Sequence, residues 1–373
     1  MKELRIKDIC DKGSSNLKQK DVEGKNGQYP VYGASGIISH IDTYHQEDNY
    51  IAIVKDGSGI GRVTFMPAKS SVIGTMQYIL PKEGFNINYI GYCLQSLDLS
   101  KYKQGAAIPH IYFRDYGERI VKVTEDINEQ QTIVDYLDSA FAKIDAMKVH
   151  AEKALNEAKA LFQASLKEML EPKEGWKEKT LGEMSEIQSG FAFKSTQFQK
   201  RGEFQVIRMG NVRPGIIRYN ESPVFIDSVD ENTIEKSLLK VGDMIITQTG
   251  SRNKRDYGFT VLIDKEKLLL NQRIARIRVV NTITNKYLLY YSWTDYFRDQ
   301  YFANEGGTVG QGNVGIDAIR YAVISYPSLS EQQSIVATLD SLKSKVDRLQ
   351  ENYDKISQEC DALKQAILRQ VFE

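Results

Sequence analysis

The sequence predicts a mixed α/β protein (α+β) arranged as a pseudo-twofold tandem repeat: two domains separated by two long helices that form an antiparallel coiled coil. Three observations predict this fold. The string Glu-Gln-Gln-x-Ile-Val occurs at 129–134 and again at 331–336, which indicates a duplicated unit. Apolar residues then recur at steps of three and four, the spacing of a coiled-coil seam. Strand-forming runs broken by Gly and Asn precede each copy.

The length and composition fit a multidomain globular protein. A chain of 373 residues predicts two or three domains, and its 41% hydrophobic and 26% charged residues are typical of a packed core. The sequence has no uninterrupted apolar run near the ~20 residues that a membrane-spanning helix needs. Residues 1–10 alternate charges with Leu and Ile, unlike a signal peptide. We therefore expect a cytoplasmic protein without a membrane partner.

The cysteines and histidines do not predict a metal site. Cys10, Cys93 and Cys360 contain no Cys-x-x-Cys pair, so we expect neither a disulfide framework nor a zinc ribbon. His40 and His45 are five residues apart, which does not place both side chains on one face of a helix.

The chain divides into four segments by its residue patterns. An N-terminal domain covers 1–127, a long helix covers 128–171, a C-terminal domain covers 172–329, and a second long helix covers 330–373. Within the two domains, the predicted strands lie at 50–54, 120–123, 243–247, 274–280 and 322–324.

The two domains also share a shorter predicted helix and a glycine element. The helix is expected at 87–97 in the first domain and at 285–297 in the second, each with two tyrosines in the same order. The glycine elements follow at 105–107 and 306–308. These parallels indicate that the whole unit, and not only its helix, is duplicated.

The long helices are the clearest part of the repeat. Ten of twenty residues are identical between 128–147 and 330–349. Asn128 and Ser330 are cap-like residues that precede the repeated Glu, and Pro172 cannot continue the first helix. About 42 residues at ~1.5 Å each predict rods of roughly 60 Å.

Each long helix carries one apolar stripe, which we expect to face the other helix. A single stripe is more typical of a bundle core, but two matched stripes in one chain favour pairing between them. The first stripe is rich in Ala and the second in larger residues, and small residues facing large ones fill a core without voids. The expected core positions are Ile133, Leu137, Ile144, Met147, Leu161, Ile335, Leu339, Leu342, Val346, Leu349, Ile356 and Leu363.

The sequence predicts no catalytic residue. The string 56–61, Asp-Gly-Ser-Gly-Ile-Gly, resembles a phosphate-binding glycine loop, but such a loop needs a helix behind it. A strand pattern follows at 62–66, which favours a glycine-rich hairpin or loop. The sequence contains neither a P-loop motif nor a Gly-x-Ser-x-Gly string. We therefore expect no active site.

Recognition chemistry is better represented than catalytic chemistry, because basic, amide and aromatic side chains cluster in predicted turns, first in the second domain. The loop 248–258 carries three cations, two amides and a tyrosine between two predicted strands. Arg can bond a guanine edge, Asn or Gln an adenine edge, and Lys or Ser a phosphate; an ordinary solvated turn is an equally good interpretation of this loop alone. Small residues at 308–313 permit close backbone approach to a ligand. The candidates are Lys194, Arg208, Asn211, Arg213, Gln248, Ser251, Arg252, Asn253, Lys254, Arg255, Gln311 and Asn313.

The first domain offers parallel positions with different side chains, so its target would differ. For any one of these residues, hydrogen bonding within a loop is a commoner role than a base contact. The candidates are Tyr32, Ser35, Lys55, Ser58, Arg62, Gln104 and His110.

Three strings resemble the specificity subunits of type I restriction-modification systems (the HsdS family). They are the Pro-x-Leu-x-Glu-Gln-Gln-x-Ile-Val junction at 327–336, Gly-Asp-Met-Ile at 242–245, and Tyr-Pro-Val-Tyr-Gly at 29–33. The resemblance covers essentially the whole chain, and the duplication makes it specific. The first junction, at 124–128, lacks the proline.

The resemblance implies a DNA-reading subunit that is not itself an enzyme. Each domain would be a target recognition domain for one half of a bipartite site in double-stranded DNA, and the helices would fix the unspecific spacer. The same helices would dock two methyltransferase (modification) subunits, and two restriction/translocase subunits would complete the complex. S-adenosylmethionine, ATP and Mg²⁺ would belong to those partners, with no cofactor in this chain.

Two other classes of function stay open at this stage. A coiled-coil adaptor would bind only proteins and would show no salt-sensitive DNA binding, even with its partners. A nuclease would cleave DNA alone with a divalent metal, but the sequence offers no convincing acidic cluster for one. The near-neutral net charge, 49 basic against 49 acidic residues, predicts weak DNA binding by the chain alone.

Overall fold

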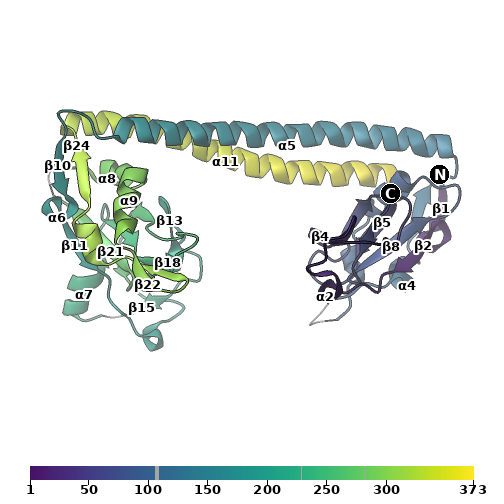
Figure 1. Ribbon diagram of the computed structural model, residues 1–373, viewed down its shortest axis with the longest axis horizontal. Helices are drawn as coiled ribbons and strands as arrows, with labels where there is room; N and C mark the ends of the chain where they lie inside the picture. The colour runs from purple at the N-terminus through teal and green to yellow at the C-terminus, as the bar shows by residue number, and fades with distance from the viewer. Residues whose placement is uncertain (106–108, 228, 281) are drawn as a thin grey trace. The chain divides into compact units, whose positions relative to one another are not determined.

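A computed structural model describes residues 1–105, 109–227, 229–280 and 282–373 (Figure 1). The chain forms two compact units: unit 1 comprises Met1–Lys153 with Glu351–Glu373, and unit 2 comprises Ala154–Gln350. Two helices of 44 residues, α5 (Ile127–Leu170) and α11 (Leu329–Phe372), each contribute to both units. Within the described residues, no helix is long and apolar enough to cross a membrane.

Unit 1 contains two sheets and a terminal strand pair. The four-stranded antiparallel sheet has the order β2-β8-β5-β6, and a three-stranded sheet has the order β4-β3-β7 with β3 parallel to β7. The fully buried run Tyr50–Val54 forms the central strand β5, as its apolar sequence predicts. The elements are β1 (Lys2–Arg5), α1 (Ile6–Ile9), β2 (Cys10–Ser14), α2 (Gln19–Val22), β3 (Tyr29–Gly33), β4 (Gly36–Ile41), β5, β6 (Val63–Met66), β7 (Ser71–Val72), β8 (Met76–Pro81), α3 (Ile87–Ser96), η1 (Leu99–Tyr102), α4 (Phe113–Tyr116) and β9 (Ile120–Val123), which pairs with β1.

Unit 2 repeats this topology with insertions. Its four-stranded sheet has the order β11-β21-β17-β19, and its second sheet, β15-β12-β20-β16, again contains one parallel pair, β12 with β20. The elements are β10 (Lys177–Thr180), α6 (Leu181–Met184), β11 (Ser185–Ser189), η2 (Ser195–Gln197), β12 (Phe204–Ile207), η3 (Met209–Asn211), β13 (Val212–Arg213), β14 (Ile216–Ile217), β15 (Phe225–Ile226), α7 (Glu231–Ser237), β16 (Leu238–Leu239), β17 (Met244–Thr247), β18 (Thr249–Ser251), β19 (Thr260–Leu262), β20 (Leu268–Leu270), β21 (Ile274–Val279), α8 (Asn285–Tyr291), α9 (Asp295–Ala303), β22 (Gly306–Thr308), β23 (Gln311–Asn313), α10 (Ile316–Arg320) and β24 (Val323–Tyr326).

Two predicted elements differ from the structure. The expected helix at 285–297 is two helices, α8 and α9, because Thr294 begins a new helix by accepting the backbone N–H of Phe297 with its hydroxyl. The expected glycine element at 306–308 is a strand, β22. Of its counterpart at 105–107, residues 106 and 107 lie outside the described residues.

The Gly-Asp-Met-Ile string of unit 2 is explained by a buried ion pair. Asp243 is buried, and its carboxylate accepts two hydrogen bonds of 2.7 Å from Arg278, from Nε and Nη2. The same carboxylate accepts the backbone N–H of Lys240 at 2.8 Å, which closes the turn before β17. Gly242 adopts a φ of +92° in this turn, a conformation that favours glycine. This string is therefore structural.

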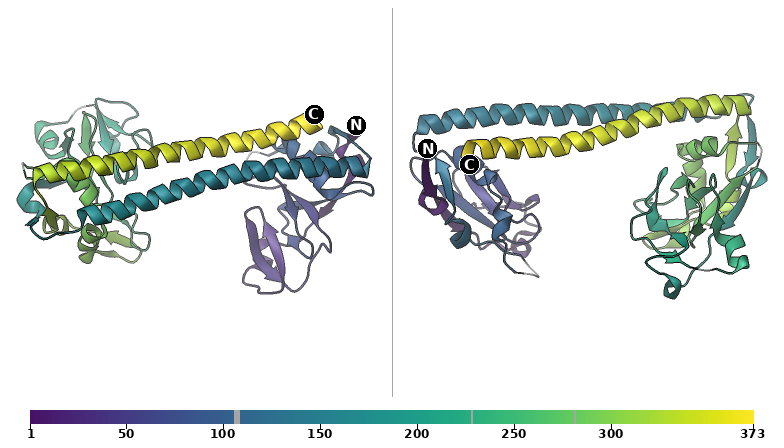
Figure 2. Two further views of the ribbon diagram at one scale, coloured as in Figure 1. Left: turned by 90° about the horizontal axis from the view of Figure 1, so that it is seen from above. Right: turned by 180° about the vertical axis from the view of Figure 1, so that it is seen from behind.

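Within each unit, the segments of α5 and α11 run side by side in opposite directions (Figure 2). In unit 1, Lys364 donates to Asp145 at 2.6 Å, and Lys148 lies 3.8 Å from Asp361, so three steps forward on α5 match three steps back on α11. In unit 2, Lys159 donates to Gln350 at 2.8 Å in the same register. The antiparallel pairing predicted from the two stripes is thus present in each unit.

The buried face of α5 differs from the expected apolar stripe: about half of its positions lie one residue later in the sequence. Met147 and Leu161, expected in the core, are 57% and 58% exposed. The buried neighbours are Leu155 and Phe162, because two adjacent stripes both fit steps of three and four, and the one with larger side chains buries more apolar area. Lys148 interrupts that stripe in the sequence; it is half-buried and directs its ammonium group to an acidic partner.

The seam on α11 follows the expected stripe until Cys360 and then moves. Leu363 is 48% exposed, whereas Leu368 and Phe372 are buried in the core of unit 1. The Phe372 ring lies 5.2 Å from the ring of Tyr89, so the end of α11 turns its apolar face toward α3. The other expected core positions are buried or half-buried: Ile133, Leu137, Ile144, Ile335, Leu339, Leu342, Val346, Leu349 and Ile356.

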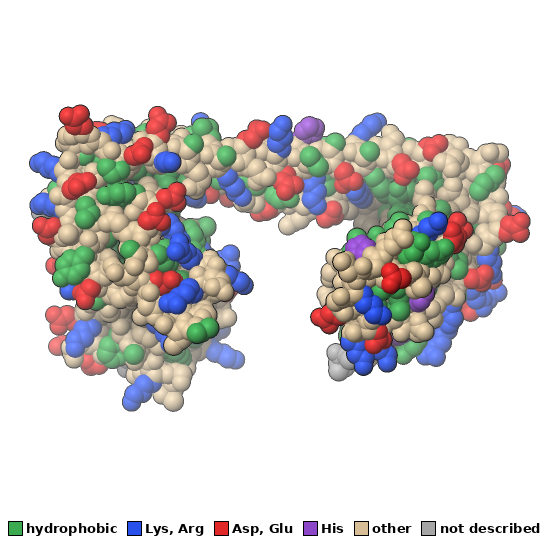
Figure 3. All heavy atoms as spheres, viewed as in Figure 1, with side chains coloured by type: hydrophobic (Ala, Val, Ile, Leu, Met, Phe, Trp, Pro, Cys, Tyr) green, Lys and Arg blue, Asp and Glu red, His purple; other side chains and the backbone are tan. Residues whose placement is uncertain are grey.

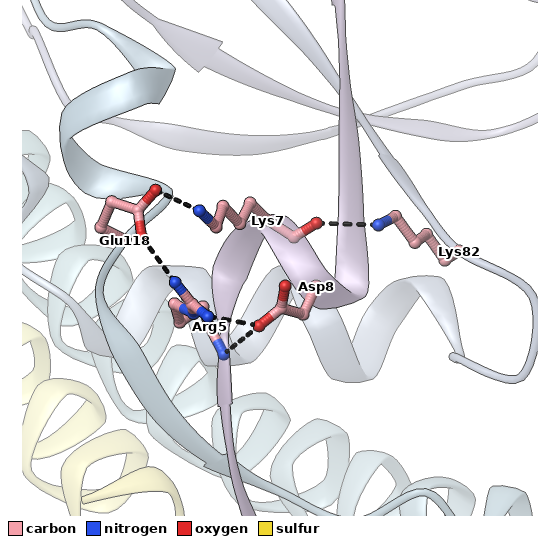
Figure 4. A network of polar contacts seen from close by, with 5 residues as sticks. All are labelled: Arg5, Lys7, Asp8, Lys82 and Glu118. Carbon is pink, nitrogen blue, oxygen red and sulfur yellow. Dashed lines mark hydrogen bonds and ion pairs between the residues drawn. The ribbon is translucent and has the colours of Figure 1, made fainter.

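Exposed charges connect the first strand and helix of unit 1 to the turn before β9 (Figure 4). Glu118 accepts hydrogen bonds from Lys7 and from Arg5, the latter at 3.2 Å, and Lys82 donates to the backbone carbonyl of Lys7 at 2.8 Å. The hydrogen bonds from Lys7 and Arg5 hold the pKa of Glu118 below its usual value. Because these side chains are exposed to solvent, their ion pairs contribute little to the free energy of folding.

Candidate nucleic-acid interface

The recognition loop predicted in unit 2 is part of a separate small sheet. Strand β18 pairs with β23, and β23 pairs with β22, so residues 249–251 and 306–313 form one three-stranded ribbon. A turn at 252–255 projects from β18. The structure therefore brings together two segments that the sequence singled out separately, 248–258 and 308–313.

The candidate side chains of this ribbon fall into exposed and engaged groups. Gln248 is buried and donates to the carbonyl of Val314 at 3.2 Å, so it holds β18 in place. Arg252 is engaged as well, since its guanidinium donates to the carbonyl of Gly306 at 2.7 Å. Ser251 is half-buried. The exposed candidates are Asn253, Lys254, Arg255, Gln311 and Asn313.

Two arginines share one aromatic ring beside this turn. The guanidinium carbons of Arg255 and Arg298 lie 4.8 Å and 5.2 Å from the centre of the Phe302 ring. Burial lowers the pKa of Arg298, and the neighbouring charge of Arg255 acts in the same direction. Two cations held this close attract an anion such as a phosphate. Sequence reasoning missed Arg298, which lies on α9 far from the turn in sequence.

A second group of candidates lies around a pocket of about 380 Å³ that is lined in part by the residues of η3. Arg208 and Asn211 line this pocket, together with Gln272 and Arg273 from the loop between β20 and β21. Asn211 is buried, and its amide nitrogen donates to the carbonyls of Arg218 and Glu221, so its role here is to shape the turn.

Other cations near this pocket differ in their availability. Arg213 folds back onto the carbonyls of Gly210 and Val212 at 3.0 and 2.8 Å, whereas Arg273 is exposed and has a φ of +69°. Sequence reasoning missed Gln272 and Arg273, although two polar residues between the apolar runs of β20 and β21 are a usable signal. Lys194 is exposed at the start of η2.

The candidates of unit 1 gather around the loop between β5 and β6. Lys55 and Asp56 lie against the segment at His110: the backbone N–H of Ile111 donates to the carbonyl of Lys55 at 3.0 Å, and His110 Nδ1 bonds to Asp56. Gln104 exchanges two backbone hydrogen bonds of 2.8 Å with His110. Three candidates that are separate in the sequence thus form one cluster.

The glycine string of this loop positions an arginine. Arg62 donates to the carbonyl of Ala34 at 3.0 Å, which joins the loop to the turn between β3 and β4. Its guanidinium lies directly over Gly59, where an added Cβ would come within 2.1 Å of Nη2. A side chain at this position would displace the arginine. Ser35 and Ser58 are exposed nearby in these two turns, and Tyr32 is half-buried.

Sequence reasoning missed two residues that extend the unit 1 cluster. The Tyr112 ring lies 4.1 Å from the His110 ring, and the Arg114 guanidinium lies 4.4 Å over Tyr112. Both residues are exposed, and an exposed stack of aromatic and guanidinium groups suits contact with bases or sugars. Both clusters contain arginine and an aromatic ring, but only unit 1 adds a histidine, His110, stacked against its tyrosine.

Cationic side chains gather near the ribbon of unit 2, with acidic side chains among them (Figure 3). Figure 3 shows Lys and Arg side chains gathered over the part of unit 2 that carries β13 and β18. Among the described residues, no group of His, Cys, Asp or Glu side chains could hold a metal ion. The interface offers hydrogen-bond donors and cations for an anionic partner.

Comparison with known proteins matches both halves of the chain to one family. The family model for the type I restriction modification DNA specificity domain matches residues 1–157 and 173–358. The specificity subunit of the Escherichia coli type I restriction enzyme EcoBI is 26% identical over 212 residues, covering 57% of this chain and 41% of that protein. The chain thus spans less than half the length of that relative.

Two further relatives cover more of the chain. The specificity subunit of the type I restriction enzyme MjaVIII from Methanocaldococcus jannaschii is 26% identical over 319 residues, which is 80% of this chain and 73% of that protein. A solved structure concerning assembly and conformational transition of the type I restriction-modification system has a TM-score of 0.71 and 16% identity, covering 98% of this chain and 96% of that one. This likeness shows a shared fold. The chain belongs to the type I restriction-modification DNA specificity domain family, with one copy of the domain in each half.

Proposed function

We propose that this chain is the DNA-recognition subunit of a type I restriction-modification complex, in which each α/β domain reads one half of a bipartite site. The duplication carries this proposal. The same sheet order, β2-β8-β5-β6 and β11-β21-β17-β19, occurs in both units, and each copy supports its own loop cluster. Two copies of one reading module with different side chains suit two different half-sites.

The loop chemistry supports an asymmetric target. Arg255 and Arg273 of unit 2 present guanidinium groups, which bond guanine edges or phosphates. His110 and Gln104 of unit 1 sit in a cluster with an aromatic ring. Because the two clusters offer different donors and acceptors, the two half-sites would differ in sequence.

The helix pair is proposed to set the unspecific spacer and to dock two methyltransferase subunits. The antiparallel register is the same in each unit, which suits a stiff spacer. Met147, Leu161 and Leu363 expose apolar side chains on the two helices, and we propose these positions as contacts for the methyltransferase subunits. Two restriction/translocase subunits would complete the complex in the cytoplasm.

Chemistry in this complex would belong to the partners. S-adenosylmethionine, ATP and Mg²⁺ would bind the methyltransferase and translocase subunits, and this chain would supply sequence recognition without catalysis. The equal numbers of basic and acidic residues support weak binding by the chain alone. The methyltransferases would add phosphate contacts that tighten it.

The binding experiment separates this proposal from a protein-only adaptor. The chain is co-purified with the modification subunit of its own operon, and the affinity for duplex DNA is measured by fluorescence anisotropy at several salt concentrations. We expect binding by the complex that weakens steeply with salt, at a slope of about −0.9 per phosphate contact. An assembled complex with no salt-dependent DNA binding would support the adaptor.

A further inference from the structure

The most exposed apolar side chain of the described residues stands at the tip of a β-hairpin in unit 2. Strands β22 and β23 pair with Thr308 opposite Gln311, which leaves Val309 and Gly310 as the turn. Gly310, the second central residue of the turn, has a φ of +83°, a conformation that favours glycine. The Val309 side chain is fully exposed, at 102% of its reference area. The fold itself gives this side chain nothing to pack against.

The hairpin is firmly attached at its base through Arg252. The guanidinium donates to the carbonyl of Gly306 at 2.7 Å, and its Nε lies 3.3 Å from a carboxylate oxygen of Glu305. The backbone N–H of Arg252 donates to the carbonyl of Gly310 at 3.2 Å. The side chain of Glu305 is 13% exposed and that of Arg252 is 39% exposed, so this ion pair is partly shielded from solvent. Arg252 therefore fixes both ends of the hairpin.

A buried tyrosine supports the hairpin from below. Tyr257 is buried, with its ring 5.1 Å from Phe302. A Cβ added at Gly312 of β23 would lie 2.0 Å from the Tyr257 hydroxyl and 2.4 Å from Oε1 of Glu305. Any side chain at position 312 would collide with these groups, so glycine is required for the strand to lie this close to them. A hairpin that is held at its base and at the backbone of its turn, with one exposed apolar side chain at the tip, is a preformed reading element.

We propose that this hairpin enters the major groove of double-stranded DNA and reads an A·T-containing step there, with Val309 against a thymine methyl group and Gln311 on an adenine edge. The inference rests on the proposed DNA-recognition function and names the element that performs it in unit 2. Arg252, predicted from the sequence to contact DNA, is instead a positioning residue for the hairpin.

The dimensions and chemistry of the hairpin match this groove. The major groove admits a two-stranded β-ribbon, and there an A·T pair displays both the thymine methyl group and the adenine N6 and N7 atoms. Glutamine bonds that adenine edge with two hydrogen bonds, and an aliphatic side chain packs on the methyl group. Lys254 and Arg255 lie on the adjoining turn and are exposed, which places cations beside the groove where the phosphates run.

The test compares two hairpin variants with a matched control in the assembled methyltransferase complex. Val309→Ala and Gln311→Ala are expected to relax the motif at one or two adjacent positions of one half-site, mapped by sequencing methylated DNA. Loss of the Gln311 contact should reduce discrimination there by about 5- to 150-fold, the range for a bidentate base contact. Val241→Ala, at another exposed valine in the turn before β17, should leave the motif unchanged.

A thymine-to-deoxyuracil probe tests the methyl contact directly. Removing the methyl group from the contacted base should weaken binding of the wild-type complex several-fold and leave binding of the Val309→Ala complex unchanged. Equal losses in both complexes would overturn the assignment of Val309. A complex that still methylates a bipartite motif while both hairpin variants behave as Val241→Ala would overturn this inference and keep the proposed function. An assembled complex without any methylation would contradict the proposed function itself.

The role of Arg252 has its own test. The double variant Arg252→Gln with Glu305→Gln removes the ion pair without leaving one charge buried alone. It should reduce sequence discrimination at the same base pairs as Val309→Ala does. Adding Val309→Ala to the double variant should then cause little further loss of discrimination. Relaxation at a different base pair, additive with the Val309 effect, would instead show that Arg252 contacts a base itself.

Discussion

The side-chain amide of Gln332 joins the start of α11 to the start of α8. Its oxygen accepts the backbone N–H of Thr284 at 2.9 Å, and its nitrogen donates to the carbonyl of Pro327 at 3.1 Å. Gln130 does the same at the start of α5, accepting from Asn86 at 2.7 Å and donating to Thr124 at 3.0 Å. Both glutamines are completely buried. The first glutamine of the repeated Glu-Gln-Gln string thus connects each long helix to its own domain.

Replacing Gln332 should destabilise unit 2. Gln332→Ala leaves the buried N–H of Thr284 and the carbonyl of Pro327 without partners, at a cost of about 1–3 kcal/mol for each group. Gln333→Ala is the matched control, because Gln333 is exposed on the same turn of α11. The free energy of unfolding is measured by urea denaturation followed by circular dichroism. Equal effects of the two substitutions would show that the buried amide is unimportant.

The buried ion pair between Asp243 and Arg278 should be essential for stability. Asp243→Ala leaves the Arg278 guanidinium, which is 27% exposed, and the backbone N–H of Lys240 without their carboxylate partner, and we expect a loss of about 1–3 kcal/mol. The control is Asp317→Ala, which removes an exposed ion pair of the same residue types with Arg320 and should change stability by less than ~1 kcal/mol. Thermal denaturation of both variants checks this. A Tm for Asp243→Ala close to that of the control would be inconsistent with our interpretation.

The seam observed on α5 predicts opposite outcomes for two leucines. Leu155→Ala removes a buried side chain and should cost about 2–5 kcal/mol, whereas Leu161→Ala should leave the free energy of unfolding within ~0.5 kcal/mol. If Leu161 contacts the proposed methyltransferase subunits, Leu161→Ala should weaken assembly with them, measured by analytical ultracentrifugation. The reverse order of stability effects would support the stripe first expected from the sequence.

The capping carboxylate of α6 should contribute to stability in a pH-dependent way. Glu183 accepts hydrogen bonds from the hydroxyl and backbone N–H of Thr180 at 2.7 and 2.8 Å, which lowers the pKa of Glu183 below its ordinary value of 4.5. A lowered folded-state pKa stabilises the fold above pH 4.5, and this contribution disappears as the pH falls through the folded-state value.

The variant Glu183→Gln isolates this contribution. Wild type should be more stable than the variant at neutral pH, and the difference should shrink toward zero as the pH falls below the lowered pKa. Chemical denaturation of both proteins between pH 7 and pH 3 measures it. A difference that stays constant across this range would mean that the titration of Glu183 is not linked to folding.

Much of the fold could be predicted because its signals are local or repeated. The Tyr50–Val54 run is apolar throughout and became a central strand, and the repeated Glu-Gln-Gln string located both helix starts. The exact seam could not be predicted, since Leu137 and Ile144 belong to both possible stripes and only packing against α11 decides between them. The break at Thr294 was missed because a hydroxyl cap competes with an uninterrupted apolar pattern.

The sequence indicated which loops carry the candidate residues. It did not indicate which of their side chains bond within the protein and which are exposed. Arg252 and Asn211 have the side chains expected for base contacts, yet both are engaged within the protein. Both side chains donate to backbone carbonyls, Arg252 to that of Gly306 and Asn211 to that of Arg218. Because every residue has such a carbonyl, no sequence pattern shows these bonds. Arg298 was missed for the same reason, because its position beside the predicted turn arises only from tertiary structure. Arg273 was missed although the polar residues between two apolar runs are visible in the sequence.

The most direct test of the account maps methylated adenines in DNA modified by the complex of this chain with its own modification subunits. Wild type should give one bipartite motif with an unspecific gap. Asn253→Ala with Arg255→Ala in unit 2 should alter one half of the motif, and Lys55→Ala with Gln104→Ala in unit 1 should alter only the other half. A complex that assembles but methylates nothing, or variants of one unit that change both halves alike, would contradict the claim that each domain reads its own half-site.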